Sequence, residues 1–196
     1  MRLKNNFLCI VALALSSLNL AADPQAGKTE QTEITSRWQP LFNGKDLSGW
    51  HPLPGGKWQV KDGTILGTCA KSEKRHGLLV SDKTYKNFIL RAKFKVITGD
   101  SGLYFRVQKT GTRAGVKGFQ AEVDNTPQVG GLYETAGRAW VKEPAPALIK
   151  RIYQPGKWTQ ITITAMGDHI TVSLNGTTTT ELLADQKCLK QGHIAL

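Results

Sequence analysis

The chain has 196 residues, of which 40% are hydrophobic, and its 26 basic and 15 acidic residues give a formal net charge of +11. This length suits one domain with a sizeable core rather than two. A positive surplus attracts anionic polysaccharide, lipid head groups or nucleic acid. The basic residues are scattered, however, with short clusters only at Lys71–Arg75 and Arg91–Lys95, which is typical of a solubilising surface.

The N-terminus has the pattern of a cleavable secretory signal peptide. Arg2 and Lys4 precede an apolar run over residues 7–20, and small residues follow up to Ala22. This order predicts cleavage near Ala22. The alternative, a retained membrane anchor, is disfavoured because the run is shorter than the roughly 20 residues that a spanning helix needs.

The cleavage site divides the chain into a signal peptide (1–22), a flexible lead-in (23–37) and a single β-sandwich domain (38–196). The lead-in is expected to be flexible because it contains almost nothing apolar. Cleavage leaves 24 basic residues against 15 acidic ones, a formal charge of +9. We expect the mature protein in the periplasm or outside the cell, with no nucleic-acid partner and no membrane span. The oligomeric state is left open.

Apolar residues alternate with polar ones over most of the domain, which indicates half-buried strands. The pattern is clear over residues 88–96 and 170–174. Asp62-Gly63 and Asn175-Gly176 predict hairpin turns. Only residues 144–152 and 182–187 suggest short helical or loop insertions, so no βαβ units and no parallel sheet are expected. The sequence predicts an all-β fold, a two-sheet antiparallel sandwich of the jelly-roll kind.

The residues that commonly bind metals form no recognisable site. The four histidines share no metal-ligand spacing. Glu122, Asp124 and nearby carbonyl oxygens could ligate calcium, but no loop has the acidic spacing of a specific site. We therefore predict no cofactor and no metal, with calcium left open. A disulfide between Cys69 and Cys188 is also left open, because an exported chain permits one but a sandwich of this size does not need it.

Two predicted strands carry polar side chains on one face. In residues 101–107, Tyr104 and Arg106 fall on the face opposite to the apolar side chains, which are Leu103, Phe105 and Val107. In residues 118–124 the corresponding polar side chains are Gln120, Glu122 and Asp124.

These five polar residues share one face if the two strands pair. Glu122 and Asp124 would lie roughly 6.7 Å apart, a gap that admits a water or a sugar hydroxyl. The row is typical of a binding surface, where arginine forks onto oxygens, tyrosine contacts a sugar and carboxylates move a proton. The alternative is an ordinary solvated face held by an ion pair between Arg106 and Glu122.

Four tryptophans follow turns or lie in loops. Trp50, Trp58 and Trp158 stand at turn or strand-start positions and are interpreted as core anchors. Trp140 lies in a polar loop, where it could provide a platform on which a sugar stacks.

The segment Leu41–Trp50, LFNGKDLSGW, resembles the opening signature of the 3-keto-disaccharide hydrolase domain family. Further matches follow in the family's order: Trp58–Gly63, Gly77–Val80, Tyr85–Phe88, Ser101–Arg106, Gly118–Asp124, Gly131–Tyr133, Pro155–Trp158 and Leu174–Gly176. The resemblance implies a concanavalin A-like jelly roll. It also implies an exported bacterial protein of carbohydrate breakdown.

The resemblance further implies an activity on glycosides whose sugar is oxidised to a ketone at carbon 3. A base removes the acidified proton at carbon 2, the leaving group at carbon 1 departs by elimination, and water is added later. Mapped onto this chain, Glu122 or Asp124 is the base and Arg106 supports the enolate oxygen. The expected sugar-binding residues are Tyr104, Gln120, Tyr133 and Trp140.

Two departures from the family pattern bear on this mapping. The family commonly has Glu-x-Gln-x-x-Asp where this chain has Gln120 and Glu122 in exchanged places. The family also continues beyond residues 192–196 with a Gln-x-His segment and a final strand, so we expect a truncated chain whose sheet lacks one edge strand. The leading hypothesis is a 3-keto-glycoside enzyme. The alternatives are a non-catalytic sugar-binding module and a cell-surface interaction domain.

Overall fold

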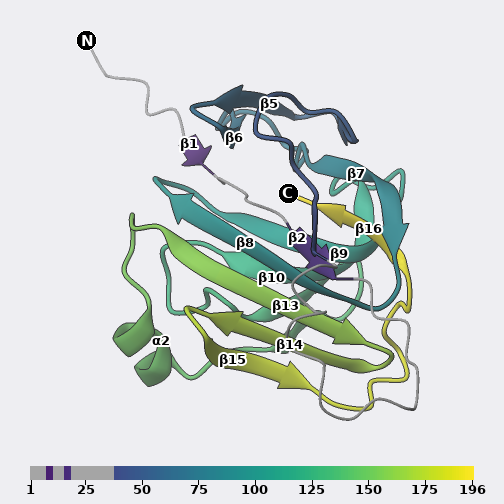
Figure 1. Ribbon diagram of the computed structural model, residues 1–196, viewed down its shortest axis with the longest axis vertical. Helices are drawn as coiled ribbons and strands as arrows, with labels where there is room; N and C mark the ends of the chain where they lie inside the picture. The colour runs from purple at the N-terminus through teal and green to yellow at the C-terminus, as the bar shows by residue number, and fades with distance from the viewer. Residues whose placement is uncertain (1–7, 11–15, 19–37) are drawn as a thin grey trace.

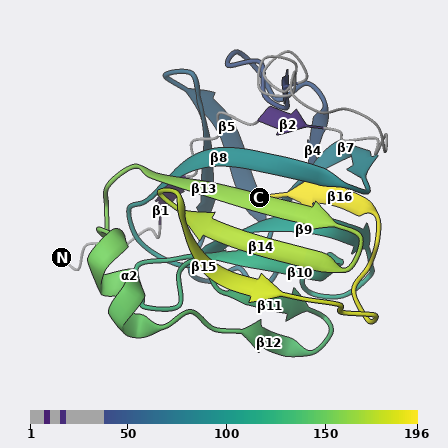
Figure 2. The same ribbon diagram turned by 60° about the horizontal axis from the view of Figure 1, so that its bottom comes forward.

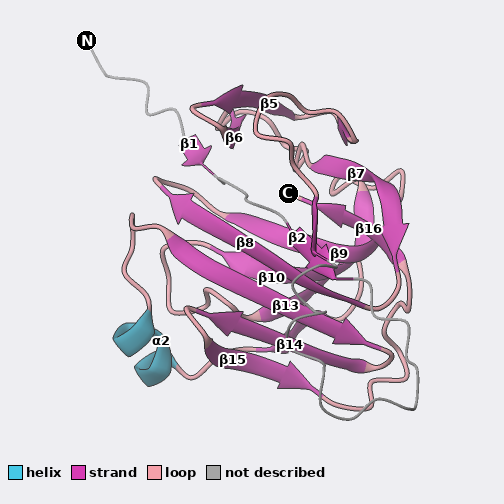
Figure 3. Cartoon of the chain, in the orientation of Figure 1, coloured by secondary structure: helices cyan, strands magenta, loops and turns pink. Residues whose placement is uncertain are grey.

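The computed structural model describes residues 8–10, 16–18 and 38–196, with side chains from Trp38 onward. These ranges form two antiparallel sheets and one short helix (Figures 1 and 3). The prediction of an all-β, two-sheet antiparallel sandwich is confirmed.

The first sheet has the strand order β15-β14-β13-β8-β1-β6-β5, and β2 pairs with both β8 and β3. Its strands are β1 (Leu8–Ile10), β2 (Ser16–Leu18), β3 (Trp38–Pro40), β5 (Gly56–Lys61), β6 (Thr64–Cys69), β8 (Phe88–Val96), β13 (Thr159–Met166), β14 (His169–Leu174) and β15 (Thr177–Leu182).

The second sheet has the order β12-β11-β10-β9-β16-β7-β4, so the last strand in the chain lies between β9 and β7. Its strands are β4 (Trp50–Pro52), β7 (Leu79–Tyr85), β9 (Ser101–Lys109), β10 (Val116–Val123), β11 (Leu132–Thr135), β12 (Ala139–Lys142) and β16 (Gly192–Ala195). Figure 2 shows β8, β13, β14 and β15 in front of β9 and β10.

The core fills the space between the two sheets. On β8 the apolar residues Phe88, Leu90, Ala92 and Phe94 are buried while the residues that alternate with them are more exposed, as the pattern predicts. On the second sheet, the rings of Phe105 and Phe119, which are paired residues of β9 and β10, stack with their centroids 5.6 Å apart. Burial of apolar surface is the dominant favourable contribution to folding, and each such ring removes a large apolar area from water.

The predicted turns and insertion are present. Asp62 and Asn175 have φ of 51° and 49°, and a glycine with positive φ follows each, as a two-residue hairpin turn requires. The helix α2 (Pro146–Ile152) begins with proline in its first turn, where the missing N–H costs nothing, and buries Ile149.

Strand β9 breaks the predicted alternation. Arg106 and Val107 together oppose the single residue Gly118 of β10, which is a β-bulge. Arg106 has a φ of 50°, and a Cβ at Gly118 would lie only 3.0 Å from the Arg106 carbonyl oxygen. Beyond the bulge, Val107 packs with Tyr104 outside the core instead of with Leu103 inside it. The prediction that Val107 shares a face with Leu103 is therefore wrong.

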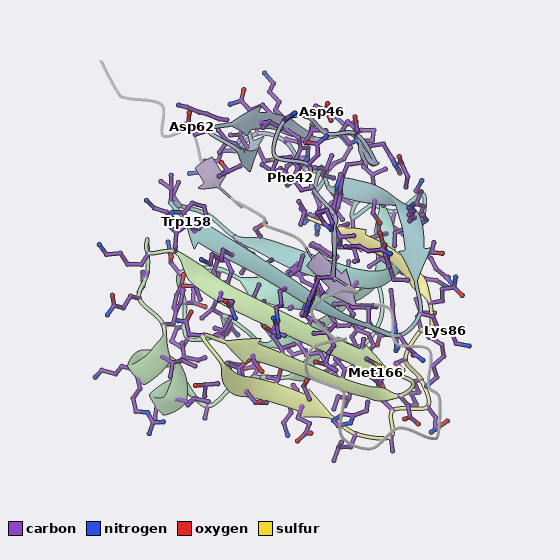
Figure 4. All side chains as sticks on the ribbon, viewed as in Figure 1. Phe42, Asp46, Asp62, Lys86, Trp158 and Met166 are labelled. Atoms are coloured by element: carbon purple, nitrogen blue, oxygen red, sulfur yellow. The ribbon has the colours of Figure 1, made fainter. Side chains whose placement is uncertain are left out.

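The tryptophans expected to anchor the core differ in their exposure. Trp50 is buried and Trp58 is partly buried against the core. Trp158, labelled in Figure 4, is 48% exposed, so the prediction is wrong there. The reason is local: the next residue, Thr159, begins β13 with its side chain buried, and alternation turns Trp158 outward.

The N-terminal segments β1 and β2 contribute backbone pairing: β1 pairs with β6 and β8, and β2 with β3 and β8. The rest of the proposed signal peptide and the whole of the lead-in, residues 23–37, lie outside the described residues, so both assignments stay predictions. Among the described residues, no helix has the length and apolar character needed to cross a membrane.

Candidate functional site

A cleft of about 820 Å³ opens on the face of the second sheet that points away from the core. Its floor is formed by β9 and β10, and its walls come from β11, β12 and the loops that precede β7, β9 and β10. The predicted residues among its lining are Tyr104, Gln120, Glu122, Asp124, Tyr133 and Trp140. The sequence therefore identified six of the residues that the structure brings together.

Alternation along β10 builds the floor. Phe119, Ala121 and Val123 are in the core, so Gln120 and Glu122 point into the cleft. On β9, Tyr104 pairs with Gln120. The two strands pair, which meets the condition under which Tyr104, Gln120 and Glu122 share one face.

Glu122 is the most perturbed acid of the floor. Its side chain is buried, and burial raises the pKa of Glu122 to about 10, with further upward contributions from hydrogen bonding to Asp100 and from the charges of Asp100 and Asp124. A carboxyl group with this pKa keeps its proton at neutral pH. Glu122 can therefore donate a proton, and a carboxylate beside it can accept one.

Gln120 holds the Glu122 carboxyl in place. Its Nε2 donates to Glu122 Oε2 at 3.1 Å, and its Oε1 accepts from Thr135 Oγ1 at 3.1 Å. The Gln120 side chain lies across Gly102, where a Cβ would come within 2.5 Å of Gln120 Cγ. A side chain at residue 102 would displace Gln120, so glycine there is a packing requirement of the site.

Asp124 is fixed at the end of β10. Its Oδ1 accepts from the Thr126 backbone N–H at 3.1 Å, and the Thr126 hydroxyl donates to Oδ2. The Asp124 carbonyl oxygen accepts from Tyr153 Oη at 2.7 Å. These bonds orient a carboxylate at the cleft, next to the protonated Glu122.

Aromatic side chains form one wall of the cleft. The Tyr133 and Trp140 rings meet edge to face with centroids 5.4 Å apart, and residues of this kind provide apolar faces for sugar rings. Tyr104 is buried, and burial, followed by the charges of Glu122 and Asp100, raises the pKa of Tyr104. Its hydroxyl therefore stays protonated and can donate a hydrogen bond.

Basic side chains form another part of the wall. Lys74, Arg75 and His76 come from the loop before β7, and Arg113 from the loop between β9 and β10. Burial, then the Arg113 charge, lowers the pKa of His76. His76 is thus uncharged at neutral pH.

Arg106 does not line the cleft. Its side chain is fully buried and donates to the carbonyl oxygens of Lys86 at 2.7 and 2.9 Å, Gly167 at 2.6 Å and Leu189 at 3.3 Å. Figure 4 shows Lys86 and Met166, the neighbour of Gly167, at the same end of the molecule.

The bulge in β9 is the reason for this placement, because it turns Arg106 away from the face that Tyr104 occupies. The predicted position of Arg106 beside Glu122 is wrong, and the alternative of an ion pair between them is not formed in the described part of the chain. Arg106 ties the turns after β7 and β13 to the segment before β16 instead.

Sequence reasoning missed Asp100, His76 and Arg113. A signal for Asp100 existed: Ser101 pairs with Val123, so the preceding residue, Asp100, comes opposite Asp124. His76 and Arg113 come from loops distant in sequence, and no sequence signal joins them.

Within residues 38–196, Cys69, at the cleft, and Cys188 are free thiols, so the structure has no disulfide between them. Among residues 38–196, no group of three or more histidine, cysteine or acidic side chains is arranged to hold a metal ion.

Comparisons with known proteins agree with this architecture. The family model described as the 3-keto-alpha-glucoside-1,2-lyase-like domain matches residues 37–196. A structure described as a putative glycosyl hydrolase from Parabacteroides distasonis is 20% identical, with a TM-score of 0.62 over 87% of this chain and 92% of that chain. The carbohydrate-binding module CBM66 from Bacillus subtilis is 16% identical, with a TM-score of 0.55 over 75% of this chain and 85% of that chain. At these identities the two structures show a shared fold. No curated protein matches the chain.

Proposed function

The chain belongs to the family of 3-keto-alpha-glucoside-1,2-lyase-like domains, and from this premise we propose that it cleaves glycosides whose sugar carries a ketone at carbon 3. It is a carbohydrate-active β-sandwich domain, and the cleft on its second sheet is the proposed site of reaction.

The proposed chemistry is an elimination. The ketone acidifies the hydrogen at carbon 2, so a base removes that proton and the electron pair is held as an enolate. The enolate then expels the oxygen at carbon 1, which takes a proton from an acid as the bond to carbon 1 breaks. Water adds later to the unsaturated sugar. The site must therefore supply a base, an acid and a donor to the enolate oxygen.

The residues of the floor suit these roles. Asp124 is the base, because the pKa of Glu122 is raised to about 10 and this carboxyl holds its proton at neutral pH. Glu122 is then the acid that protonates the leaving oxygen. Tyr104, which stays protonated in its buried position, donates to the enolate oxygen in place of Arg106, which faces elsewhere. The buried Glu122 carboxyl, held by Gln120 on the cleft floor with Asp100 and Asp124 in the same lining, is the observation that carries the proposal.

The direct test measures release of the leaving group from a 3-keto-glucoside and from its unoxidised parent. We expect release from the ketone alone, and Glu122→Gln and Asp124→Asn should each lower kcat by about 10²–10⁴-fold. Glu143→Gln is the matched control, because Glu143 is exposed and lies outside the cleft. Full turnover by both cleft variants would overturn the assignment.

Sugar binding without catalysis is the second candidate, and the Tyr133 and Trp140 ring pair supports it. Calorimetry with the same two glucosides separates the candidates. Binding of both with release from neither would favour a binding module. Binding of neither would favour an interaction domain.

We also propose that the protein is exported, on the basis of the N-terminal pattern of residues 1–22. Mass spectrometry of the protein from a secreting host should find an N-terminus near Asp23. A mature protein that retains Met1 and stays in the cytoplasm would overturn this proposal.

A further inference from the structure

The cleft carries basic side chains that the elimination does not use. Lys74 and Arg113 come from two different loops and line the same cleft as the catalytic carboxyl groups. No salt bridge within residues 38–196 involves either side chain. The neighbouring acid Glu73 is engaged by Arg75, with Nη2 to Oε2 at 2.7 Å and Nε to Oε1 at 2.9 Å, so it does not neutralise them.

Arg113 is held in a defined position. Its Nη2 lies 3.4 Å from His76 Nε2, and its carbonyl oxygen accepts from the His76 backbone N–H at 3.3 Å. The loop that bears it is closed by backbone hydrogen bonds from Thr110 to Gly115 and from Gly115 to Thr112. Because His76 is uncharged, it accepts from the guanidinium without repelling it, and the remaining N–H groups of Arg113 can fork onto an anion.

The basic side chains lie on the other side of the floor from the aromatic wall. Tyr133 and Trp140 belong to β11 and β12, which follow β10 on one side, whereas the loop with Lys74 and His76 leads into β7 on the other. His76 and Arg113 line the same cleft as Asp100, which precedes β9, and Glu122 of the floor. A glycoside whose sugar stacks on the aromatic rings and whose leaving group extends across the floor would place that group at the basic wall.

We infer that the cleft takes glycosides whose leaving group carries a negative charge, a carboxylate or a sulfate, bound by Arg113 and Lys74. This inference rests on the proposed function and specifies its substrate class. The carboxyl groups on the floor act on the neutral keto sugar, and the charged group stays at the wall.

The test compares three 3-keto-glucosides of cyclohexanol that bear a carboxylate, a carboxamide or a sulfate at ring position 4. The carboxylate and the carboxamide have nearly the same shape, so they differ mainly in charge. We expect kcat/KM for the carboxylate to exceed that for the carboxamide by about 10-fold at low salt, because hydrogen bonds to charged groups are the stronger ones. The preference should shrink as the ionic strength rises.

Arg113→Gln and Lys74→Gln should each lower kcat/KM for the carboxylate more than for the carboxamide, so that the preference for the charged substrate falls. Lys117→Gln is the matched control, because Lys117 is exposed and lies outside the cleft. Equal kcat/KM values for the charged and neutral substrates would overturn the inference and leave the proposed function standing. If none of the substrates is turned over, the proposed function fails and calorimetry still tests the inference. Tighter binding of the charged glucosides than of the carboxamide, lost in Arg113→Gln, would support the inference. Equal binding of the charged and neutral glucosides would overturn the inference.

Discussion

Two buried ionisable side chains on neighbouring strands have opposite surroundings. Arg106 on β9 is fully buried and donates to the carbonyl oxygens of three segments. Glu122 on β10 is 6% exposed and has Asp100 and Asp124 as neighbours. Burial, followed by these two acidic side chains, raises the pKa of Glu122 to about 10. Burial alone therefore does not mark a functional group. A buried charge whose hydrogen bonds are all accepted by its neighbours keeps its charge, whereas a buried acid with like-charged neighbours changes its protonation state and becomes available for chemistry.

The largest effect is expected from Arg106→Met. This substitution removes the hydrogen bonds from the buried guanidinium to the carbonyl oxygens of Lys86, Gly167 and Leu189, and a hydrogen bond to a charged group contributes about 1.5–3 kcal/mol. The free energy of unfolding should fall by roughly 3–5 kcal/mol, measured by urea denaturation at pH 7. A loss below about 1 kcal/mol would show that Arg106 does not hold these segments together.

Glu122→Gln should have an effect on stability that depends on pH. The pKa of Glu122 is raised in the folded protein from 4.5 to about 10, so the folded state binds the proton more tightly than the unfolded chain. The stabilisation is complete below about pH 4.5 and is lost as the pH rises toward 10. The wild type should therefore lose stability relative to Glu122→Gln between pH 5 and 9. Parallel stability curves of the two proteins across this range would contradict the assignment.

Trp158→Ser should have the smallest effect. With 48% of its surface exposed, Trp158 loses little burial on replacement, and the free energy of unfolding should change by less than about 1 kcal/mol. Trp50→Ala is the contrasting variant, since Trp50 is buried and its loss should cost about 3–5 kcal/mol. If the free energy of unfolding falls equally in the two variants, Trp158 is a core anchor after all and the account of its exposed position is wrong.

The sequence predicted the parts of this fold that depend on local pattern. Alternation placed Gln120 and Glu122 on one face because β10 keeps a period of two from Phe119 to Val123. The hairpin turn at Asn175-Gly176 could be predicted because asparagine and glycine adopt the positive φ that such a turn requires. Alternation failed at Arg106, because a bulge reverses the faces of a strand and depends on Gly118 in the partner strand. It could not find Arg113, because the contact with His76 joins loops that only the tertiary fold brings together.

The most direct test of the central claim is the titration of Glu122 itself. In protein labelled with ¹³C at the glutamate side-chain carboxyl, the Glu122 resonance is assigned by its absence in Glu122→Gln, and its chemical shift is followed from pH 4 to 11. We predict that this carboxyl stays protonated through pH 7 and titrates with a pKa of about 10. Titration near the ordinary value of 4.5 would contradict the account, because the cleft would then have no protonated Glu122 to act as the acid.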